Sequence, residues 1–519
     1  MSYWECTSKI IEVFTINFAW IIKIPIIRAF LCGFSMPKNE ILKNIIIDKL
    51  IFGGKWLGIA PDGRKVIISW WCIPGSIVNI RILKERKSHY EWQQLDIVKK
   101  SPIEIPLPEG FQMYGWAKWL TISYPDQLRI KSEQVREAFH YLRDFTCDTQ
   151  WHPIIPSPEI YGYRNKVEFS WGKYISAREW VHDEFRFGFH AQGQFDRIED
   201  CTYCALADPE TNSIFQSVNT LSRASGFSTY DPKTGEGFWR HLVIRRGKPE
   251  GEVMLIFSVN GLYAEKAGDI KIFFTKMVQQ LTEKFGNIVS IYFLENIGRA
   301  DIVTGNPILL FGKPSISAEL LGLTFDIQPK SFFQVNTLWA EKLYTVASEF
   351  IQQKWWVLLD LYAGTGTIGI LLSPYFSRVY SVELVESASV DGARNAVQNA
   401  VQNVEFIQAR VEKFAEEFAK AGSKADTIVL DPPRDGLHPD AIPYILSFGA
   451  QEIIYVSCNP ATLSRDLEMF VGKKKEGTEE DNKIDPQKQL HTYRITDITP
   501  VDMFPHTHHI ETVIRLERI

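Results

Sequence analysis

Residues 355–370, WWVLLDLYAGTGTIGI, decide the fold of the C-terminal part of the chain. An apolar run leads into a glycine-rich turn, and a second apolar run follows that is typical of a helix. The turn contains G-x-G-x-x-G at Gly364, Gly366 and Gly369. This spacing brings backbone N–H groups close to the phosphates of a dinucleotide. A tight strand-to-helix turn that binds no ligand can have the same glycine spacing. The stretch predicts a strand, a turn and a helix that together hold a nucleotide-like cofactor.

Around this stretch, apolar strands alternate with helical patterns from about residue 339 onward. Such alternation is typical of a parallel, doubly wound sheet. We therefore predict a Rossmann-like domain over residues 331–519. Its strands are expected at 355–361, 378–383, 404–407, 426–431 and 452–457.

The N-terminal part has a different residue pattern, in which short apolar runs are separated by the turn residues Asp62-Gly63 and Pro74-Gly75. Runs at this spacing predict a small β-barrel over residues 36–100. This segment holds 12 Lys or Arg against 6 Asp or Glu, whereas the whole chain has a net charge of −5. A basic barrel on an acidic body is expected of an RNA-binding module, because phosphate contacts supply most sequence-independent affinity; a solvated charged face is the alternative. A central α+β domain that also binds RNA is predicted over 110–330.

Length and composition set the class of protein. With 519 residues the chain is long enough for three or four domains, and 45% hydrophobic residues can form sizeable cores. Seven Cys in so long a chain do not make a disulfide scaffold. A reduced, cytoplasmic enzyme is expected. Residues 473–488 lack an apolar period and predict a disordered surface loop.

The first 35 residues are rich in Ile and aromatic residues, but Glu12, Lys23, Pro25 and Arg28 interrupt them. Charges near the centre of a bilayer cost a few kcal/mol each, so a membrane span is disfavoured. A translated upstream stretch before a true start at Met36, and an interfacial helix or short anchor, are the interpretations left open.

Two carboxylates favour S-adenosylmethionine as the cofactor. Asp360 stands four residues before Gly364, where methyltransferases keep an acidic residue near the methionine end of this cofactor. Glu383 ends the next predicted strand, where a carboxylate can accept both ribose hydroxyls. Glu383 suits NAD equally well. The glycine turn by itself is therefore also consistent with the function of an NAD-dependent oxidoreductase.

The chemistry is carried by residues expected at the carboxyl edge of the sheet. Asp431-Pro432-Pro433-Arg434 follows the fourth strand, Cys458 follows the fifth, and Glu511 opens the last. An Arg where amine methylases keep an aromatic residue argues against methylation of an exocyclic amine. A Cys and a Glu at one edge suit methylation of a pyrimidine at carbon 5, since a thiolate can add to carbon 6 and a carboxylate can remove the carbon 5 proton.

The string from Asp360 to Glu511 resembles the RNA uracil-5-methyltransferase family, and the likeness extends over about residues 40–519. Three further stretches match this family: GYRNKVEFS (162–170), RHLVIRR (240–246) and QPKSFFQVN (328–336). The resemblance implies a class I methyltransferase sheet, a TRAM/OB-like barrel, an RNA substrate and S-adenosylmethionine as methyl donor.

The resemblance also implies roles for single residues. Cys458 is the expected nucleophile and Glu511 the expected base. The other residues are expected to bind substrate or cofactor. The expected substrate contacts are Gln334, Asp431 and Arg434, and the expected cofactor contacts are Gln334, Asp360, Tyr362, Gly364, Gly366, Glu383 and Asp431.

Departures from the family concern metals. Many relatives hold an iron–sulfur cluster with three Cys in a C-x5-C-x2-C run before a QLxxK helix, but residues 111–128 contain no Cys. Cys147 is interpreted as a remnant of the fourth ligand, and no cluster is expected. Cys201-x-x-Cys204 and the group His506, His508 and His509 are not expected to bind a metal. Ala409-Arg410 stands where an acidic residue would contact the adenine of the cofactor, so the sequence does not assign a residue to this contact.

Methylation of a uridine in ribosomal RNA or tRNA is the first choice among the functions. An NAD-dependent oxidoreductase and a catalytically inactive RNA-binding protein are the alternatives. We expect a monomer that acts neither on DNA nor at a membrane.

Overall fold

The computed structural model describes residues 40–519 with short gaps. The gaps are 61–62, 69–71, 87–88, 115–116, 177–180, 192–193, 195, 249–250, 262–266, 352–354 and 474–491. The predictions for residues 1–35 and, apart from residue 473, for the loop at 473–488 concern residues outside the described part. No helix among the described residues is long and apolar enough to cross a bilayer.

The chain forms two compact units. The first comprises the residues up to Pro106 together with Thr121–Asp126, and the second comprises Leu107–Leu120 and Gln127–Ile519. The predicted domain limits at residues 36, 100, 110 and 330 stay predictions.

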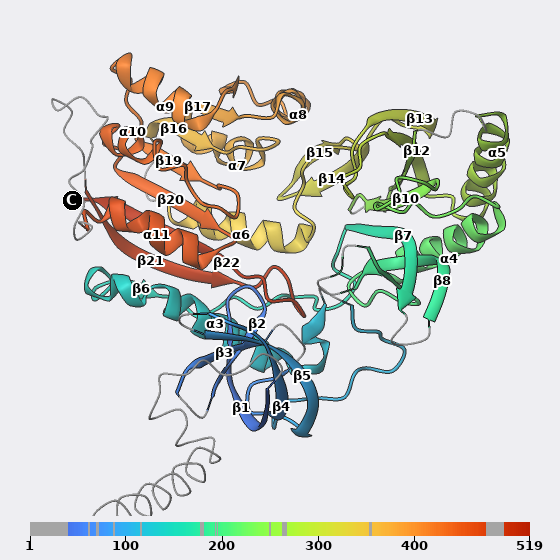
Figure 1. Ribbon diagram of the computed structural model, residues 1–519. Helices are drawn as coiled ribbons and strands as arrows, with labels where there is room; N and C mark the ends of the chain where they lie inside the picture. The colour runs from blue at the N-terminus through green and yellow to red at the C-terminus, as the bar shows by residue number, and fades with distance from the viewer. Residues whose placement is uncertain are drawn as a thin grey trace, which may run out of the picture. The chain divides into compact units, whose positions relative to one another are not determined.

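The first unit contains a closed five-stranded barrel with the strand order β1-β2-β3-β5-β4 (Figure 1). It closes because β4 pairs antiparallel with β1. Alternation along the strands turns Trp56, Val78 and Trp92 inward, where they are almost completely buried. The predicted small β-barrel is confirmed. Its strands are β1 (Ile41–Ile51), β2 (Lys55–Ile59), β3 (Lys65–Ile68), β4 (Ile77–Glu85) and β5 (His89–Lys99).

The second unit begins with helical turns and then forms a seven-stranded sheet of the order β13-β12-β11-β10-β7-β8-β9. One face forms an aromatic core with α4 and α5, in which Trp171 stacks on Phe187 at 4.0 Å. The elements up to this sheet's last strand are η1 (Lys118–Thr121), α3 (Tyr124–Ala138), η2 (His140–Phe145), β6 (Gln150–Trp151), β7 (Lys166–Ser176), β8 (Val181–His190), β9 (Ile198–Asp200), α4 (Pro209–Ala224), β10 (Trp239–Arg246), β11 (Val253–Asn260), α5 (Ala267–Lys284), β12 (Ile288–Asn296) and β13 (Asn306–Gly312).

The opposite face of this sheet carries polar side chains on β7 and β10 around the buried Val243. Lys166 pairs with Arg245, and Ser170 pairs with His241. Cross-strand partners lie on the same face of a sheet, so these side chains form one row. Glu168 lies between them on β7 and is 40% exposed at its side chain.

The C-terminal sheet has eight strands in the order β18-β17-β16-β19-β20-β22-β21-β6. The first five are mutually parallel, and β22 runs antiparallel to both β20 and β21. The predicted Rossmann-like sheet is confirmed, and β16 and β20 have the predicted bounds. The elements are β14 (Ile316–Leu320), β15 (Leu323–Ile327), α6 (Thr337–Glu349), β16 (Trp355–Leu361), α7 (Thr367–Leu372), η4 (Ser373–Tyr375), β17 (Phe376–Glu383), α8 (Glu386–Gln398), β18 (Val404–Gln408), α9 (Val411–Lys420), β19 (Thr427–Leu430), α10 (Ile442–Ser447), β20 (Glu452–Ser457), α11 (Pro460–Phe470), β21 (Tyr493–Val501) and β22 (Glu511–Arg518).

Candidate active site

Four residues with reactive or polar side chains meet at the carboxyl edge of the C-terminal sheet. Tyr362, Asp431 and Cys458 directly follow β16, β19 and β20, which are neighbouring parallel strands. Glu511 is the first residue of the antiparallel strand β22, so it lies at the same edge. The last ladder pair of β20 and β22 is Ser457 with Thr512, and one further step brings Cys458 opposite Glu511. The sheet register thus places the predicted nucleophile beside the predicted base.

The Cys458 thiol lies in an environment that disfavours its charge. Its pKa is raised from 9.0 to about 12, mainly by burial and further by the negative charges of Glu511 and Asp431. Arg434 acts in the opposite direction and favours the thiolate. In the protein without substrate, the thiol is therefore protonated at neutral pH.

The two carboxyl groups beside the thiol are also shifted towards their protonated forms. Burial and the charge of Asp431 raise the pKa of Glu511 well above its usual value, while Arg434 lowers it. Burial and the charge of Asp360 raise the pKa of Asp431 to about 7. A carboxyl group with a raised pKa is suited to accept a proton during a reaction near neutral pH.

Hydrogen bonds join the loop after β19 to the start of α11. The Asn459 side chain caps α11 by accepting from Ala461 N and Thr462 N. Its Nδ2 donates to the backbone oxygen of Arg434 at 2.9 Å, and Thr462 Oγ1 donates to the same oxygen at 3.1 Å. Arg434 and Cys458 are therefore held in a defined relation through Asn459.

The glycine turn after β16 has the features of a cofactor cradle. Asp360 Oδ2 accepts from Gly369 N at 3.0 Å and from Ser381 Oγ at 2.9 Å, while its buried Oδ1 has no partner among the described residues. Burial raises the pKa of Asp360 to about 6. A buried acceptor without a donor is costly unless a ligand supplies one.

The acidic residue at the end of β17 faces the same turn. Glu383 Oε2 accepts from Gly364 N at 2.9 Å, and Oε1 accepts from Val385 N at 2.8 Å. Each carboxylate oxygen keeps a further lone pair for a ribose hydroxyl. Phe332, Leu384 and Val385 are exposed by 62%, 54% and 54%, and Phe332 lies 3.9 Å from the position of a Cβ at Gly364. Polar groups for a ribose and apolar side chains for an adenine fit S-adenosylmethionine.

Two features of this edge were not expected from the sequence pattern. Tyr362 adopts a φ of +65°, a conformation that costs free energy in a non-glycine residue and is frequent at functional sites. Tyr344 on α6 is buried and hydrogen-bonded to the side chain of Gln334. The charges of Asp431, Asp360 and Glu511 raise the pKa of the Tyr344 phenol, so these carboxyl groups lie near it. Gln334, as the hydrogen-bond partner of Tyr344, therefore belongs to the same group of side chains. No motif in the sequence marks Tyr344.

Hydrogen bonds of Asn165 and Arg245 join the three matched family stretches, and Asn336 joins the last of them to Met503. Asn165 Nδ2 donates to Gln334 O at 2.8 Å, and Asn336 Nδ2 donates to Met503 O at 3.0 Å. Arg245 is buried and donates to Gln328 O and Ser331 O, both at 2.6 Å. Residues that are far apart in the chain thus fix the backbone conformation of the segment that carries Gln334.

The loop between β21 and Glu511 is held by α3. Gln127 Oε1 accepts from His506 N at 2.8 Å. Lys131 Nζ donates to Asp502 Oδ1 at 2.6 Å and to Phe504 O at 3.0 Å, and both charged side chains are fully buried. This use of Gln127 and Lys131 explains the QLxxK pattern, whose function the sequence alone did not show.

The candidate metal residues are Cys201, Cys204 and the histidines of the loop before Glu511. Among the described residues, no group of three or more His, Cys, Asp or Glu side chains is arranged to hold a metal. His506 stacks on Tyr161 at 4.6 Å. The residues that replace the family's cysteine run lie beside Cys201, since the Tyr114 phenol bonds its thiol. Cys147 is exposed and its Sγ donates to Arg143 O; its interpretation as a ligand remnant stays a prediction.

Comparison with known proteins assigns the family. A family model described as tRNA (Uracil-5-)-methyltransferase matches residues 321–519. An uncharacterized RNA methyltransferase of Clostridium tetani is 34% identical over 89% of this chain and 95% of its own length. A second one, of Caldanaerobacter subterraneus, is 30% identical over 93% of this chain and 100% of its own length. The chain belongs to the RNA (uracil-5-)-methyltransferase family.

A solved structure agrees with this assignment. The chain is 26% identical to Pyrococcus abyssi tRNA (uracil-54, C5)-methyltransferase in complex with S-adenosyl-L-homocysteine, with a TM-score of 0.68 over 91% of this chain and 99% of that one. The present protein is an RNA methyltransferase that uses S-adenosylmethionine. The assignment decides between the two cofactor interpretations of the glycine turn, and the oxidoreductase alternative is dropped.

Proposed function

We propose that this protein methylates carbon 5 of a specific uridine in RNA through a covalent bond between Cys458 and carbon 6 of the uracil. The observation that carries the proposal is the sheet register that sets Cys458 opposite Glu511, with Arg434 and Asp431 close enough to shift the pKa values of both. S-adenosylmethionine, when bound in the cradle of Asp360, Gly364, Gly366 and Glu383, supplies an electrophilic methyl group.

The first role falls to the thiol. Carbon 5 of uracil is a poor nucleophile, and addition of the Cys458 sulfur to carbon 6 converts it into an enolate carbon. The thiol has to lose its proton first, although its pKa is about 12 in the free protein. The Cys458 proton passes to the Glu511 carboxylate; Arg434 then favours the thiolate, and the neutral Glu511 no longer opposes its charge.

The second role falls to Glu511. Glu511 releases its proton to water before the final step, and after carbon 5 has gained its methyl group the Glu511 carboxylate removes the remaining proton from that carbon. The electron pair of the broken C–H bond forms the carbon 5–carbon 6 double bond, and the sulfur leaves carbon 6. The raised pKa of Glu511 makes it a stronger base than an exposed glutamate.

Recognition of the base is assigned to Gln334 and Asp431. An amide and a carboxylate can pair with the polar edge of a uracil that has been turned out of its stack. We propose that Gln334 hydrogen-bonds the ring, that Asp431 accepts from its N–H, and that Arg434 neutralises the developing oxyanion. Tyr362 and Gly366 complete the cofactor side. A monomer acting on RNA in the cytoplasm, without DNA or membrane as partner, belongs to the same proposal.

The first experiment identifies the class of RNA that is methylated. The matching family model and the Pyrococcus abyssi enzyme are both named for tRNA. Nucleoside mass spectrometry of tRNA and ribosomal RNA, from a strain with and without the gene, measures 5-methyluridine in each. We expect loss of 5-methyluridine from one of the two pools. Unchanged levels in both pools would refute the proposal.

The two catalytic roles are separated by two variants. Cys458→Ala is expected to bind RNA and to form no covalent adduct with RNA containing 5-fluorouridine, whose fluorine blocks the final deprotonation. Glu511→Gln is expected to accumulate the methylated adduct on ordinary uridine RNA, because the step that releases the sulfur is impaired. Cys147→Ala, at an exposed cysteine, is the control and should form adducts as the unmodified protein does.

A further inference from the structure

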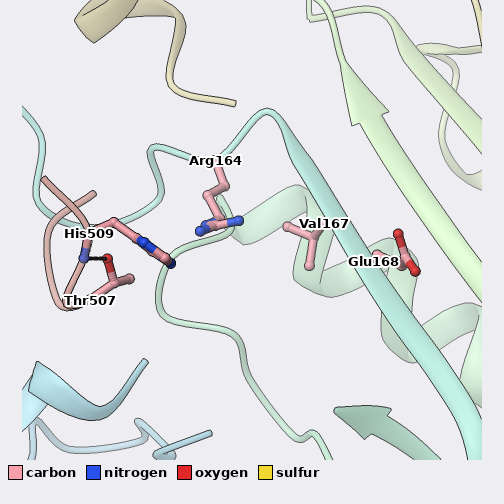
Figure 2. A pocket seen from close by; sticks show the side chains of 5 residues that line it. All are labelled: Arg164, Val167, Glu168, Thr507 and His509. Atoms are coloured by element: carbon pink, nitrogen blue, oxygen red, sulfur yellow. Dashed lines mark hydrogen bonds between the residues drawn. The ribbon is translucent and has the colours of Figure 1, made fainter. Parts of the chain in front are cut away.

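A cavity opens beside the candidate active site. It has a volume of about 220 Å³ and is lined by Arg164, Val167, Glu168, Thr507 and His509 (Figure 2). Val167 and Glu168 belong to β7 of the central sheet, and Thr507 and His509 belong to the loop that ends at Glu511. His509 Nε2 lies 3.5 Å from Arg434 Nη2. The cavity is therefore adjacent to the residues proposed for catalysis without containing them.

The side chains of this cavity suit an anion next to a polar hydroxyl group. Figure 2 shows the Arg164 side chain between His509 and β7. The backbone of Arg164 is anchored because its N–H donates to Leu206 O at 2.9 Å. Burial and the charges of His508, Arg434 and other cations lower the pKa of His509 to about 2, so its ring is neutral. Glu168 is the single carboxylate among the five lining residues.

The cavity is smaller than those that hold drug-sized ligands, which start at about 300 Å³, so it fits a fragment such as a ribose phosphate. A uracil bonded to Cys458 carries its own sugar, and the next nucleotide of the strand follows within one backbone repeat. Arginine pairs with phosphate through two parallel N–H groups, and a carboxylate accepts from a hydroxyl.

We propose that this cavity holds the sugar and phosphate of the nucleotide that adjoins the target uridine, with Arg164 on the phosphate and Glu168 accepting from the ribose 2′-hydroxyl. The proposal rests on the function proposed above, because the target uridine at Cys458 sets the position of its neighbour. The 2′-hydroxyl is the group by which a protein distinguishes RNA from DNA at a given nucleotide. Glu168 is therefore assigned a role in selecting RNA.

The test measures binding of fluorescent 12-residue oligouridylate and oligodeoxyuridylate to the full-length protein by anisotropy at several salt concentrations. Arg164→Gln should weaken oligouridylate binding about tenfold and reduce the slope of log affinity against log salt by about 0.7, the value for one phosphate contact on a single strand. Arg164→Lys should keep the slope and lose part of the affinity. Glu168→Gln should lower the preference for the ribose over the deoxyribose strand about tenfold.

Matched controls are available at the amino end of the C-terminal sheet. Arg378 on β17 pairs with Glu405 on β18 at 2.6 Å, and the two side chains are 58% and 50% exposed. Arg378→Gln and Glu405→Gln carry the same charge changes away from the cavity. If the cavity variants behave as these controls do while 5-fluorouridine RNA still forms the Cys458 adduct, the cavity proposal is wrong and the proposed function stands. If no adduct forms, the proposed function itself fails.

Discussion

At the scale of single residues, the candidate site combines three acidic groups with one thiol. Asp360, Asp431 and Glu511 all have raised pKa values, and burial is the largest cause for each. Raised values at a site mean that the folded protein holds protons there that the unfolded chain would release. The site therefore lowers the stability of the fold at neutral pH, as is common where function requires buried titratable groups.

Asp431→Asn tests this cost. The folded pKa of Asp431, about 7, lies above the unfolded value of 3.8, so its contribution to stability is fully present below about pH 4 and is lost as pH rises to about 7. The variant removes the titration, and we expect its free energy of unfolding to exceed that of the unmodified protein by roughly 1–3 kcal/mol at pH 8 and by less at pH 5. Urea unfolding at the two pH values measures the difference. Asp440→Asn, at an exposed position of the following loop, is the control; an equal gain at both pH values would contradict the assignment.

At the scale of elements, the turn after β16 shows why glycine occurs where it does. Gly366 has a φ of +72°, and a Cβ there would lie 2.3 Å from the Phe406 ring. The glycine therefore meets two requirements, a left-handed backbone and the close approach of an aromatic ring. Both belong to the tertiary structure, although the motif spacing already points to this position.

Gly366→Ala separates these two requirements when it is compared with Gly422→Ala. Gly422 has a φ of +69° and no atom within 4 Å of a Cβ position, so its substitution costs only the backbone strain of about 1 kcal/mol. Gly366→Ala should cost clearly more, about 2–4 kcal/mol, because the Phe406 ring has to move. It should also abolish the increase in melting temperature caused by S-adenosylhomocysteine. Equal destabilisation by the two variants would show that the ring contact does not matter.

The contact between α3 and the loop before Glu511 is a second feature of element scale. The buried ion pair of Lys131 and Asp502 fixes the loop that ends at the proposed base. Lys131→Met should lower the free energy of unfolding by about 3–5 kcal/mol, since it removes the cation that is paired with the buried carboxylate of Asp502.

The same variant should accumulate the RNA adduct at unchanged RNA affinity, because a displaced Glu511 impairs the release step and not binding. The double variant Lys131→Met/Asp502→Asn should regain part of the lost stability. Gel analysis of adducts formed on uridine RNA measures the first effect. A variant that simply loses adduct formation and RNA binding together would argue for a structural role only.

At the scale of the whole molecule, the basic barrel is a unit of its own in an otherwise acidic chain. Its exposed Lys43, Lys55 and Lys65 are distributed over β1, β2 and β3. Changing these three to Gln should reduce the slope of log RNA affinity against log salt by about 2 and weaken binding at physiological salt. The rate of methylation at saturating RNA should stay unchanged, because none of the residues proposed for catalysis belongs to the barrel. Single-turnover kinetics at saturating RNA checks this; a lower rate would place part of the barrel in the catalytic step.

Much of the architecture follows from the sequence. Continuous apolar runs, as in β16 and β20, predict their own strands because the inner strands of a parallel sheet are covered on both faces and need apolar residues at successive positions. The position of Glu511 at the start of the last strand is predictable as well. The roles of Tyr344, Lys131 and Arg245 are not, since an isolated residue in a helix or strand has no pattern that reveals its distant partner.

The amino-acid sequence by itself determined the order of strands and helices, the glycine turn and the residue types available for chemistry, because these depend on local periodicity and spacing. Only the tertiary structure decided which of them meet. The antiparallel placement of β22 beside β20 brings Glu511 to Cys458, and buried hydrogen bonds of Asn165 and Asn336 carry Gln334 to the same edge. These contacts join residues far apart in the chain, and their free energy exists only once the sheet has formed.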